Sequence, residues 1–275
     1  MTTPLHLIEK ENYGLEINKV YNEDCLEGMK RISDKSIDMI LCDLPYGTTD
    51  CKWDSIIPLD KLWGQYERII KDNGAIILTA TQPFASLLVY SNLKLFKYDW
   101  IWEKDQGSNF INVKNEPLKK HESILVFSKG TIANRSLRRM EYNPQGLVPC
   151  AITKTNKKKR KDGGYLGERE NFSDGVYKQE FSNYPSTILK YQRDRGLHPT
   201  QKPVDLFEYL IKTYSQEGDI VLDNCMGSGT TAIACLRSGR NFIGFEKDVE
   251  HGYYEIAQQR ILETASEMNE EVLYA

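Results

Sequence analysis

The stretch at residues 220–231 reads IVLDNCMGSGTT, and it decides the fold class of this chain. Its first residues form an apolar, β-branched run that ends in an acid, which predicts a buried strand. The glycines that follow let the backbone pass close to a ligand, and the helix predicted over Thr230–Ser238 begins with an N-terminus that favours negative charge. Gly239 suits the end of that helix. The stretch therefore predicts a strand–turn–helix unit with a ligand at its turn.

A second strand is predicted directly after this unit, over Asn241–Phe245, and Glu246 follows it. In dinucleotide-binding folds an acid at this place accepts hydrogen bonds from ribose hydroxyls. From the residues alone, a purely structural β–α turn and a nucleotide-binding Rossmann site stay open. The GxGxxG spacing and the lysine of a P-loop are both absent, which disfavours the second alternative.

Short apolar runs alternate with amphipathic stretches along most of the chain. This alternation predicts an α/β fold with a mainly parallel sheet and helices on both faces, whose ligands lie outside the carboxyl ends of the strands. The predicted strands are Ile37–Cys42, Ala75–Ala80, Tyr98–Trp102, Ser123–Phe127, Ile220–Leu222 and Asn241–Phe245. The predicted helices are Leu59–Ile70, Phe84–Tyr90, Val204–Tyr214, Thr230–Ser238 and Val249–Leu262.

The alternation stops between about Gly130 and Gly196, which predicts an insert or a small second module rather than more sheet. Residues 130–200 hold 14 Lys and Arg against 7 Asp and Glu, although the whole chain has a net charge of -3. Such a basic segment is either a solvated loop or a footprint for phosphates. The densest run gives six candidate DNA contacts, which are Lys154, Lys157, Lys158, Lys159, Arg160 and Lys161.

The composition bounds the class of protein. A chain of 275 residues is long enough for one large α/β domain, with or without an inserted module. No apolar run approaches the roughly 20 residues that cross a bilayer, and residues 1–11 do not read as a secretory signal. Six cysteines lie scattered without CxxC spacing. We therefore expect a cytoplasmic protein with neither a metal centre nor a disulfide framework.

Residues 223–231 (DNCMGSGTT) resemble the S-adenosylmethionine loop of amino-methyltransferases, whose usual form is Asp-x-Phe-x-Gly-Ser-Gly-Thr. Cys225 stands at the Phe position, which weakens a packing contact beside the cofactor and leaves the glycines and the acid intact. Glu246 resembles the ribose-binding acid of the same family.

Two further segments resemble parts of that cofactor site. Residues 198–203 (HPTQKP) resemble the segment that helps to close the pocket, in which Lys202 is either a partner of the methionine carboxylate or a surface lysine. Residues 20–25 resemble the segment whose acid, Asp24 here, contacts the cofactor adenine. The resemblance implies cofactor contacts at Asp24, Asp43, His198, Thr200, Lys202, Asp223, Cys225, Gly227, Ser228, Gly229, Thr230 and Glu246.

The strand predicted over Ile37–Cys42 is followed by Asp43, Leu44, Pro45 and Tyr46, which resemble the Asp-Pro-Pro-Tyr motif of enzymes that methylate exocyclic amines. Such an amine is a poor nucleophile because its lone pair is conjugated into the ring. The resemblance implies that Asp43 and the backbone carbonyl near Leu44 and Pro45 accept its two hydrogens, and Pro45 stiffens that carbonyl. Tyr46 would stack on the base, a contact worth roughly 1–3 kcal/mol. Methyl transfer in line with the amine then depends mainly on positioning.

Two details of this catalytic region carry further expectations. Leu44 stands where the family usually has Pro, and we expect activity to survive because the carbonyl is still present. A structural turn after the strand is the alternative for the motif as a whole. His121 and Glu122, in a segment that resembles the late strand near the target base, are expected to form a buried structural pair without a chemical role.

The catalytic motif comes first, the basic segment second and the cofactor loop last, over about residues 18–130 and 196–263. This order resembles the β group of S-adenosylmethionine-dependent DNA amino-methyltransferases, the N6-adenine/N4-cytosine family, many of them from restriction–modification systems or phages. It implies a Rossmann-like fold with circularly permuted motif order, a catalytic domain formed by residues 1–129 and 197–275, and a target-recognition insert at residues 130–196. Double-stranded DNA is the implied partner, with base flipping.

An Asp at the first motif position favours adenine N6 in this family, whereas Ser more often accompanies cytosine N4. We therefore expect site-specific methylation of adenine N6 in DNA. Three alternatives stay open, namely an N4-cytosine DNA methyltransferase, an RNA adenine methyltransferase, and a degenerate fold that binds nucleic acid without turnover. A homodimer and a cognate restriction endonuclease are further partners that the resemblance suggests.

Overall fold

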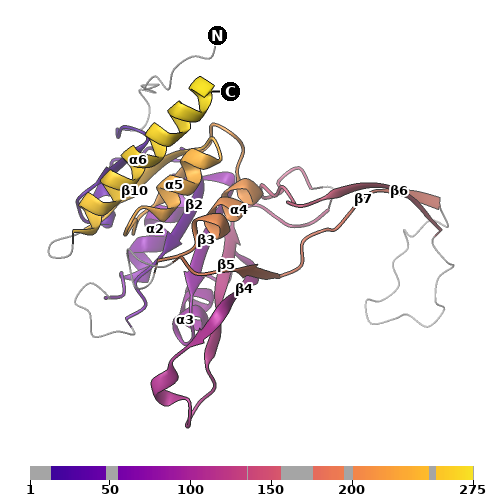
Figure 1. The fold of residues 1–275 in the computed structure, drawn as a ribbon, viewed down its shortest axis with the longest axis horizontal. Helices are drawn as coiled ribbons and strands as arrows, with labels where there is room; N and C mark the ends of the chain where they lie inside the picture. Colours follow the sequence, from indigo (N-terminus) through magenta and orange to yellow (C-terminus); the bar gives the residue numbers. More distant parts are fainter. Residues whose placement is uncertain are drawn as a thin grey trace. The chain divides into compact units, whose positions relative to one another are not determined.

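The computed structural model of the chain describes residues 14–47, 55–134, 136–155, 176–194, 201–247 and 252–274 (Figure 1). The chain divides into two compact units. The larger unit consists of Met1–Asn143 and Thr187–Ala275, and the smaller one of Pro144–Ser186. No helix within the described ranges combines the length and the apolar character needed to cross a membrane.

The larger unit is built on an eight-stranded sheet with the order β1-β10-β9-β2-β3-β5-β4-β8. The five strands β1, β10, β9, β2 and β3 are parallel to one another, β5 is antiparallel to β3 and β4, and β8 is parallel to β4. The predicted α/β fold with a mainly parallel sheet is thus confirmed. The strands are β1 (Lys19–Tyr21), β2 (Ile37–Asp43), β3 (Ile70–Ala80), β4 (Phe96–Ser108), β5 (Lys119–Ser128), β8 (Ile188–Tyr191), β9 (Ile220–Asp223) and β10 (Asn241–Phe245).

Helices cover both faces of this sheet (Figure 1). One core lies under α1 (Cys25–Met29), α2 (Leu59–Ile69) and α3 (Phe84–Ser91). The other lies under α4 (Val204–Tyr214) and α5 (Thr230–Arg237), with α6 (Tyr253–Tyr274) packed against it. A 3-10 turn, Phe110–Asn112, lies between β4 and β5. The five predicted helices are confirmed with small changes of their bounds, although α6 extends well beyond the predicted end at Leu262.

The central strand β2 is buried on both faces because its side chains alternate between the two cores. Ile40 and Cys42 lie in the core under α2, whereas Met39 and Leu41 lie in the core under α4 and α5. A strand of a parallel sheet that is covered on both sides reads as a continuous apolar run for this reason. The run from which the sequence predicted the strand, Ile37–Cys42, follows this pattern except at Asp38, which pairs with Lys71.

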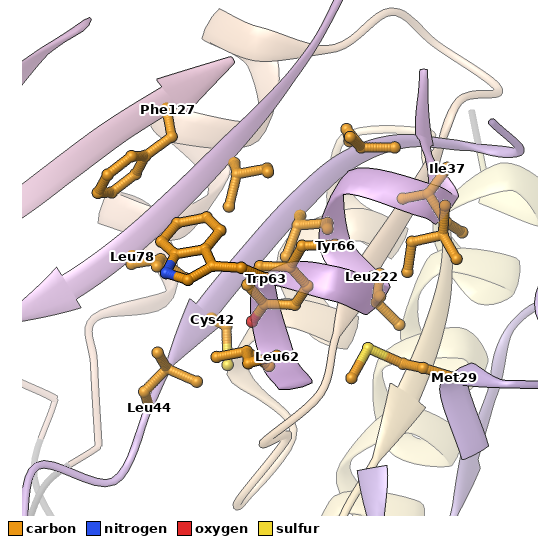
Figure 2. Close-up of a cluster of buried hydrophobic side chains, with 14 of the residues drawn as sticks. Met29, Ile37, Cys42, Leu44, Leu62, Trp63, Tyr66, Leu78, Phe127 and Leu222 are labelled. Carbon is orange, nitrogen blue, oxygen red and sulfur yellow. The ribbon is translucent and has the colours of Figure 1, made fainter. Parts of the chain in front are cut away.

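Figure 2 shows how α2 fills the first core. Leu62, Trp63 and Tyr66 of α2 are buried there. The Trp63 ring lies 4.9 Å from the ring of Phe127 on β5, and 5.7 Å from that of Tyr66 in an edge-to-face arrangement. Burial of each such side chain is worth about 1.5–3 kcal/mol, so this packing fixes the strands that carry the site.

β2 and β9 are neighbours in the sheet although Asp43 and Asp223 are far apart in the chain. Met39 pairs with Val221, and Ile40 pairs with Leu222, in parallel register. The carboxyl ends of both strands therefore lie at the same edge of the sheet, where ligands of open α/β sheets bind.

The expectation that the segment between about Gly130 and Gly196 adds no strand to the sheet is wrong for β8, Ile188–Tyr191. This strand pairs in parallel with β4, from Ile101 opposite Ile188 to Lys104 opposite Tyr191. Only Leu189 of its four residues is buried. An edge strand this short shows too little alternation of apolar and polar residues for the sequence to predict it.

The smaller unit, Pro144–Ser186, is narrower than the insert predicted for residues 130–196. It contains an antiparallel pair, β6 (Val148–Thr155) and β7 (Val176–Ser182), with Val148 opposite Ser182. Residues 130–143 belong to the larger unit, where Met140 is buried in the core. A role of the smaller unit in target recognition stays a prediction.

Candidate active site

Asp43, the last residue of β2, is the centre of a cluster of polar side chains. Its Oδ1 accepts a hydrogen bond from the Tyr46 hydroxyl at 2.7 Å and another from the hydroxyl of Thr79, which lies opposite Asp43 on β3. Its Oδ2 accepts a hydrogen bond from Lys202 Nζ at 2.5 Å. The carboxylate is fixed from three sides, yet its side chain keeps an exposed fraction of 27%, so a ligand can reach it.

Lys202 connects the catalytic cluster to the cofactor loop. It lies just before α4 and is buried, with Nζ between Asp43 Oδ2 at 2.5 Å and Glu122 Oε2 at 3.4 Å. Burial lowers the pKa of its ammonium group, but the two carboxylates outweigh burial and raise that pKa above its usual value. Its backbone carbonyl accepts a hydrogen bond from Thr230 Oγ1 at 3.5 Å. The ammonium group thus faces Asp43, and a contact with a methionine carboxylate stays a prediction.

Tyr46 is held by its hydroxyl on one side and by its ring on the other. The ring lies 5.5 Å from that of Phe84 at an angle of 32°, and Lys202 Nζ lies 5.7 Å from the centre of the Tyr46 ring. Burial, followed by the charges of Asp43 and Glu122, raises the pKa of Tyr46 well above its usual value. The hydroxyl therefore stays protonated at neutral pH and remains a donor to Asp43.

Leu44, which replaces the usual Pro of the motif, is buried and packs into the first core (Figure 2). Its side chain therefore fills space beneath the site. Pro45 and Tyr46 next to it are partly exposed. The departure from the family pattern is accommodated by packing.

Glu122 was expected to form a buried pair with His121, and the structure shows that this is wrong. Side chains that follow one another on a strand point to opposite faces, so His121 on β5 is exposed whereas Glu122 is only 8% exposed. Glu122 faces two ammonium groups, Lys104 Nζ at 2.5 Å from Oε1 and Lys202 Nζ at 3.4 Å from Oε2.

Sequence reasoning missed both Thr79 and Glu122 as members of the site. A signal for Thr79 was available, because it is the one polar residue in the run Ala75–Ala80 and stands next to its end. Glu122 gave no comparable signal, since its partner Lys202 is 80 residues away in the chain.

Asp223 is the last residue of β9, and its carboxylate binds residues of the loop and helix that follow the strand. Its Oδ1 accepts the backbone N–H of Cys225 at 3.0 Å, and its Oδ2 accepts the hydroxyl of Thr231 at the start of α5. The residue is only 3% exposed, and burial raises the pKa of its carboxyl to about 6. Asp223 therefore shapes the loop, and direct contact with a cofactor stays a prediction.

The glycines of the loop have the conformations that the sequence suggested. Gly227 and Gly229 adopt φ values of +53° and +89°, which side chains disfavour. A Cβ on Gly229 would lie 3.2 Å from Ala257 of α6, whereas a Cβ on Gly227 would meet no atom within 4 Å. The loop is thus closed against α6 at Gly229 and open at Gly227.

Side chains from α6 and β10 fix the remaining positions of the loop. Arg260 Nη1 donates to the carbonyl of Ser228 at 2.6 Å and to its hydroxyl at 3.1 Å. Glu246, just after β10, accepts the backbone N–H of Gly227 at 2.6 Å. Arg260 is a contact that sequence reasoning did not find. Cys225 is partly buried, beside Asn224 Nδ2 at 3.5 Å.

Asp24 and Glu246 follow neighbouring strands. β1 is parallel to β10, and the backbone N–H of Glu246 donates to the carbonyl of Tyr21 at 3.0 Å. Asp24 caps the N-terminus of α1, where its Oδ1 accepts a hydrogen bond from the N–H of Leu26 at 3.0 Å, and its Oδ2 accepts one from Lys247 Nζ at 3.1 Å. The two acids predicted to contact the adenosyl part of a cofactor therefore lie at the same edge of the sheet as the glycine loop.

Several predicted site residues lie outside the described parts of the chain. These are His198, Thr200, Lys157, Lys158, Lys159, Arg160 and Lys161. Lys154 lies on β6 in the smaller unit. Their predicted roles in cofactor and DNA binding stay predictions.

An acid–tyrosine pair and a glycine loop at adjacent strand ends define a Rossmann-like methyltransferase fold. The model of the DNA methylase family matches residues 37–259, and the chain belongs to this family.

Two curated relatives are similar over most of their length. The chain is 29% identical to Type II methyltransferase M1.MboII of Moraxella bovis over 255 residues, which cover 86% of this chain and 94% of that protein. It is 28% identical to DNA adenine methyltransferase YhdJ of Escherichia coli strain K12 over 262 residues, which cover 88% and 83% of the two chains.

Two solved structures share the fold. A complex of M1.HpyAVI with SAM matches with a TM-score of 0.57 and 23% identity, covering 88% of this chain and 98% of that one. The PvuII DNA methyltransferase, which is cytosine-N4-specific, matches with a TM-score of 0.61 and 13% identity, covering 90% and 91%.

Proposed function

We propose that this protein transfers a methyl group from S-adenosylmethionine to N6 of adenine at specific sites in duplex DNA, after base flipping. The observation that carries the proposal is the position of Asp43 beside the glycine loop, at the carboxyl ends of the adjacent strands β2 and β9. The relative YhdJ, named a DNA adenine methyltransferase, and the structure of M1.HpyAVI with SAM support the target and the cofactor.

The residues at the cofactor loop fit S-adenosylmethionine. Gly227 leaves open space where a Cβ would point, so the backbone there can approach a ligand closely. Glu246 and Asp24 supply carboxylates at neighbouring strand ends, suited to ribose hydroxyls and to the adenine amine. Bound S-adenosylmethionine would supply an electrophilic methyl group on a sulfonium.

On the other side of the site, Asp43 would accept a hydrogen of the target amine and orient its nitrogen toward the methyl group. The nitrogen lone pair would form the new N–C bond while the electrons of the S–C bond leave with sulfur, and the methylated nitrogen would then release one proton to water. The negative charge of Asp43 stabilises the positive charge that develops on nitrogen. Tyr46 would stack on the flipped base.

The test is product analysis after incubation of the protein with duplex DNA and S-adenosylmethionine. We expect N6-methyladenine among the nucleosides, and detection of N4-methylcytosine alone would overturn the adenine assignment. Competition between duplex DNA and RNA tests the substrate class. Asp43→Ala should lose methyl transfer and retain cofactor binding, which distinguishes an enzyme from a degenerate binding fold.

The basic run of the predicted insert would bind DNA phosphates. Replacing Lys157, Lys158 and Lys159 by Ala should weaken DNA binding and reduce its dependence on salt concentration. A charge-matched control replaces the surface lysines Lys19, Lys30 and Lys35, each of which pairs with an acid. Equal effects of the two triple variants would mean that only net charge matters. Cytoplasmic localisation, a homodimer and a cognate restriction endonuclease stay predictions.

A further inference from the structure

Asp43 has little hydrogen-bonding capacity left for a target amine. A carboxylate oxygen offers about two acceptor sites, and Oδ1 already accepts two hydroxyls, from Tyr46 and Thr79. Oδ2 accepts Lys202 Nζ at 2.5 Å. If the proposed function holds, the amine must bind at Oδ2, next to an ammonium group that competes for the same oxygen.

Glu122 provides a second acceptor for that ammonium group. Its Oε1 is paired with Lys104 Nζ at 2.5 Å. Its Oε2 is buried and has no hydrogen-bond partner among the described residues, and Lys202 Nζ lies 3.4 Å from it. A buried carboxylate oxygen without a hydrogen bond is costly, so this arrangement calls for a physical explanation.

We propose that Glu122 is a positioning residue for methyl transfer, and that its Oε2 receives the Lys202 ammonium when the target amine binds to Asp43 Oδ2. A movement of roughly half an ångström would bring Nζ from 3.4 Å to the distance of a charge-assisted hydrogen bond. The movement lengthens and weakens the Lys202 hydrogen bond to Asp43 Oδ2, so that the amine can compete for that oxygen, and it gives Glu122 Oε2 the hydrogen bond that it lacks. No proton needs to leave Lys202 in this step.

The charges of the cluster support this role. Asp43 and Glu122 carry two negative charges, and Lys202 and Lys104 carry two positive ones, in a part of the protein where screening by water is weak. Burial raises the pKa of Glu122, but the ammonium groups of Lys202 and Lys104 outweigh burial and hold that pKa below its usual value. Glu122 is therefore ionised at neutral pH, and it balances Lys202 whenever Asp43 is engaged by substrate.

The primary test is Glu122→Gln, assayed with S-adenosylmethionine and with plasmid DNA from a methylation-deficient host. The amide keeps the shape but not the charge, so Lys202 stays on Asp43. We expect kcat to fall about 10- to 100-fold, with the Kd for S-adenosylmethionine and the KM for DNA within about threefold of the parent. Glu103→Gln, on the adjacent strand β4, is the matched control, because Glu103 is a partly exposed carboxylate that also pairs with two lysines. We expect it to behave like the parent.

Lys104→Met separates positioning from a purely structural salt bridge. The substitution removes the other partner of Glu122, which should then attract Lys202 more strongly, and we expect a kcat at least equal to that of the parent. A structural role of the Lys104–Glu122 pair instead predicts equal losses for Lys104→Met and Glu122→Gln, and that result would overturn the proposal.

Glu122→Asp covers the case in which Glu122→Gln does not fold. The charge is kept but lies one methylene farther from Lys202, and we expect a kcat several-fold lower with both binding steps intact. A parent-like kcat of the folded Glu122 variants would refute the inference while leaving the enzyme active. Failure of the proposed function would instead appear as no methylation by the unaltered chain.

Discussion

Asp43 and Asp223 end adjacent strands at one edge of the sheet, but their surroundings differ in almost every respect. The side chain of Asp43 is 27% exposed and accepts hydrogen bonds from Lys202 and Thr79, which lie far from it in the chain, and from Tyr46 of its own turn. Asp223 is 3% exposed and accepts hydrogen bonds from Cys225 and Thr231 of its own loop. The same residue at equivalent strand ends is thus accessible to a ligand in one case and bonded into its own loop in the other.

The difference follows from how each charge is compensated. The charge of Asp43 lies beside the buried ammonium of Lys202, so it can persist close to a bound base. The negative charge of Asp223 is stabilised less well, because the effect of burial outweighs that of its hydrogen bonds and raises the pKa of its carboxyl to about 6. An ionised group held this way destabilises the fold at neutral pH, which is acceptable only if the loop needs its hydrogen bonds.

The largest effect that would test this comparison comes from Asp43→Asn measured against Asp223→Asn. Loss of the Asp43 charge removes the group that stabilises positive charge on the amine, so we expect kcat to fall about 10²- to 10³-fold. Its affinity for S-adenosylmethionine should change little. Asp223→Asn should weaken that affinity and reduce kcat by less than about tenfold. Single-turnover methylation and calorimetric titration measure both quantities, and equal profiles for the two variants would contradict the distinction.

A second prediction concerns stability as a function of pH. The pKa of Asp223 is about 6 in the folded chain and 3.8 in its ordinary state, so the folded state retains a proton that the unfolded state loses. The stabilisation is present below about pH 4 and is lost as pH rises through about 6, on the order of 3 kcal/mol. Asp223→Asn removes this dependence. Urea unfolding between pH 4 and pH 7 should show the variant gaining on the parent, and parallel curves would disprove the assignment.

The strand ends themselves could be predicted from the sequence. Ile37–Cys42 and Ile220–Leu222 are apolar runs long enough to indicate buried strands, and each is followed by an acid. The positive φ values of Gly227 and Gly229 agree with a turn that only glycine adopts easily. These features depend on residues that are close together in the chain, so the local sequence pattern is enough to predict them.

The partners of the two acids could not be predicted, because they depend on sheet register. Thr79 reaches Asp43 only since β2 and β3 align these two residues. Because β5 is antiparallel to β3, Glu122 near the start of β5 lies close to the carboxyl end of β3. Side chains alternate along β5, and this alternation turns Glu122 toward Lys202. β8 was missed for a similar reason, as most of its order comes from pairing with β4.

Thr79→Val and Thr231→Val form a matched pair that sharpens the comparison, since each removes one hydroxyl from one of the two acids. Thr231→Val leaves a buried carboxylate oxygen of Asp223 without its donor, and we expect the free energy of unfolding to fall by about 2 kcal/mol. Thr79→Val should affect stability less and lower kcat roughly tenfold, because Asp43 loses part of its orientation. Thermal unfolding and steady-state kinetics on both variants would reveal a reversed pattern if the two roles were exchanged.

The smallest effect is expected for Tyr46→Phe. The substitution removes the hydroxyl that donates to Asp43 Oδ1 and keeps the ring that lies against Phe84. Thr79 still donates to the same oxygen, so we expect a loss of less than about tenfold in kcat, near 1 kcal/mol, with DNA binding almost unchanged. Because the raised pKa keeps Tyr46 protonated, the variant should not alter the pH dependence of kcat below pH 10.

Tyr46→Ala is the control, because it also removes the ring and should cost a further 1–3 kcal/mol or so in binding the flipped base. If Tyr46→Phe were as damaging as Tyr46→Ala, the hydroxyl rather than the ring would carry the function of Tyr46. Asp43 would then depend on both hydroxyl donors for its orientation, and it would resemble Asp223 in needing a complete set of hydrogen bonds. A mild Tyr46→Phe effect instead leaves Asp43 oriented by Thr79 and Lys202, from the sheet side of the site.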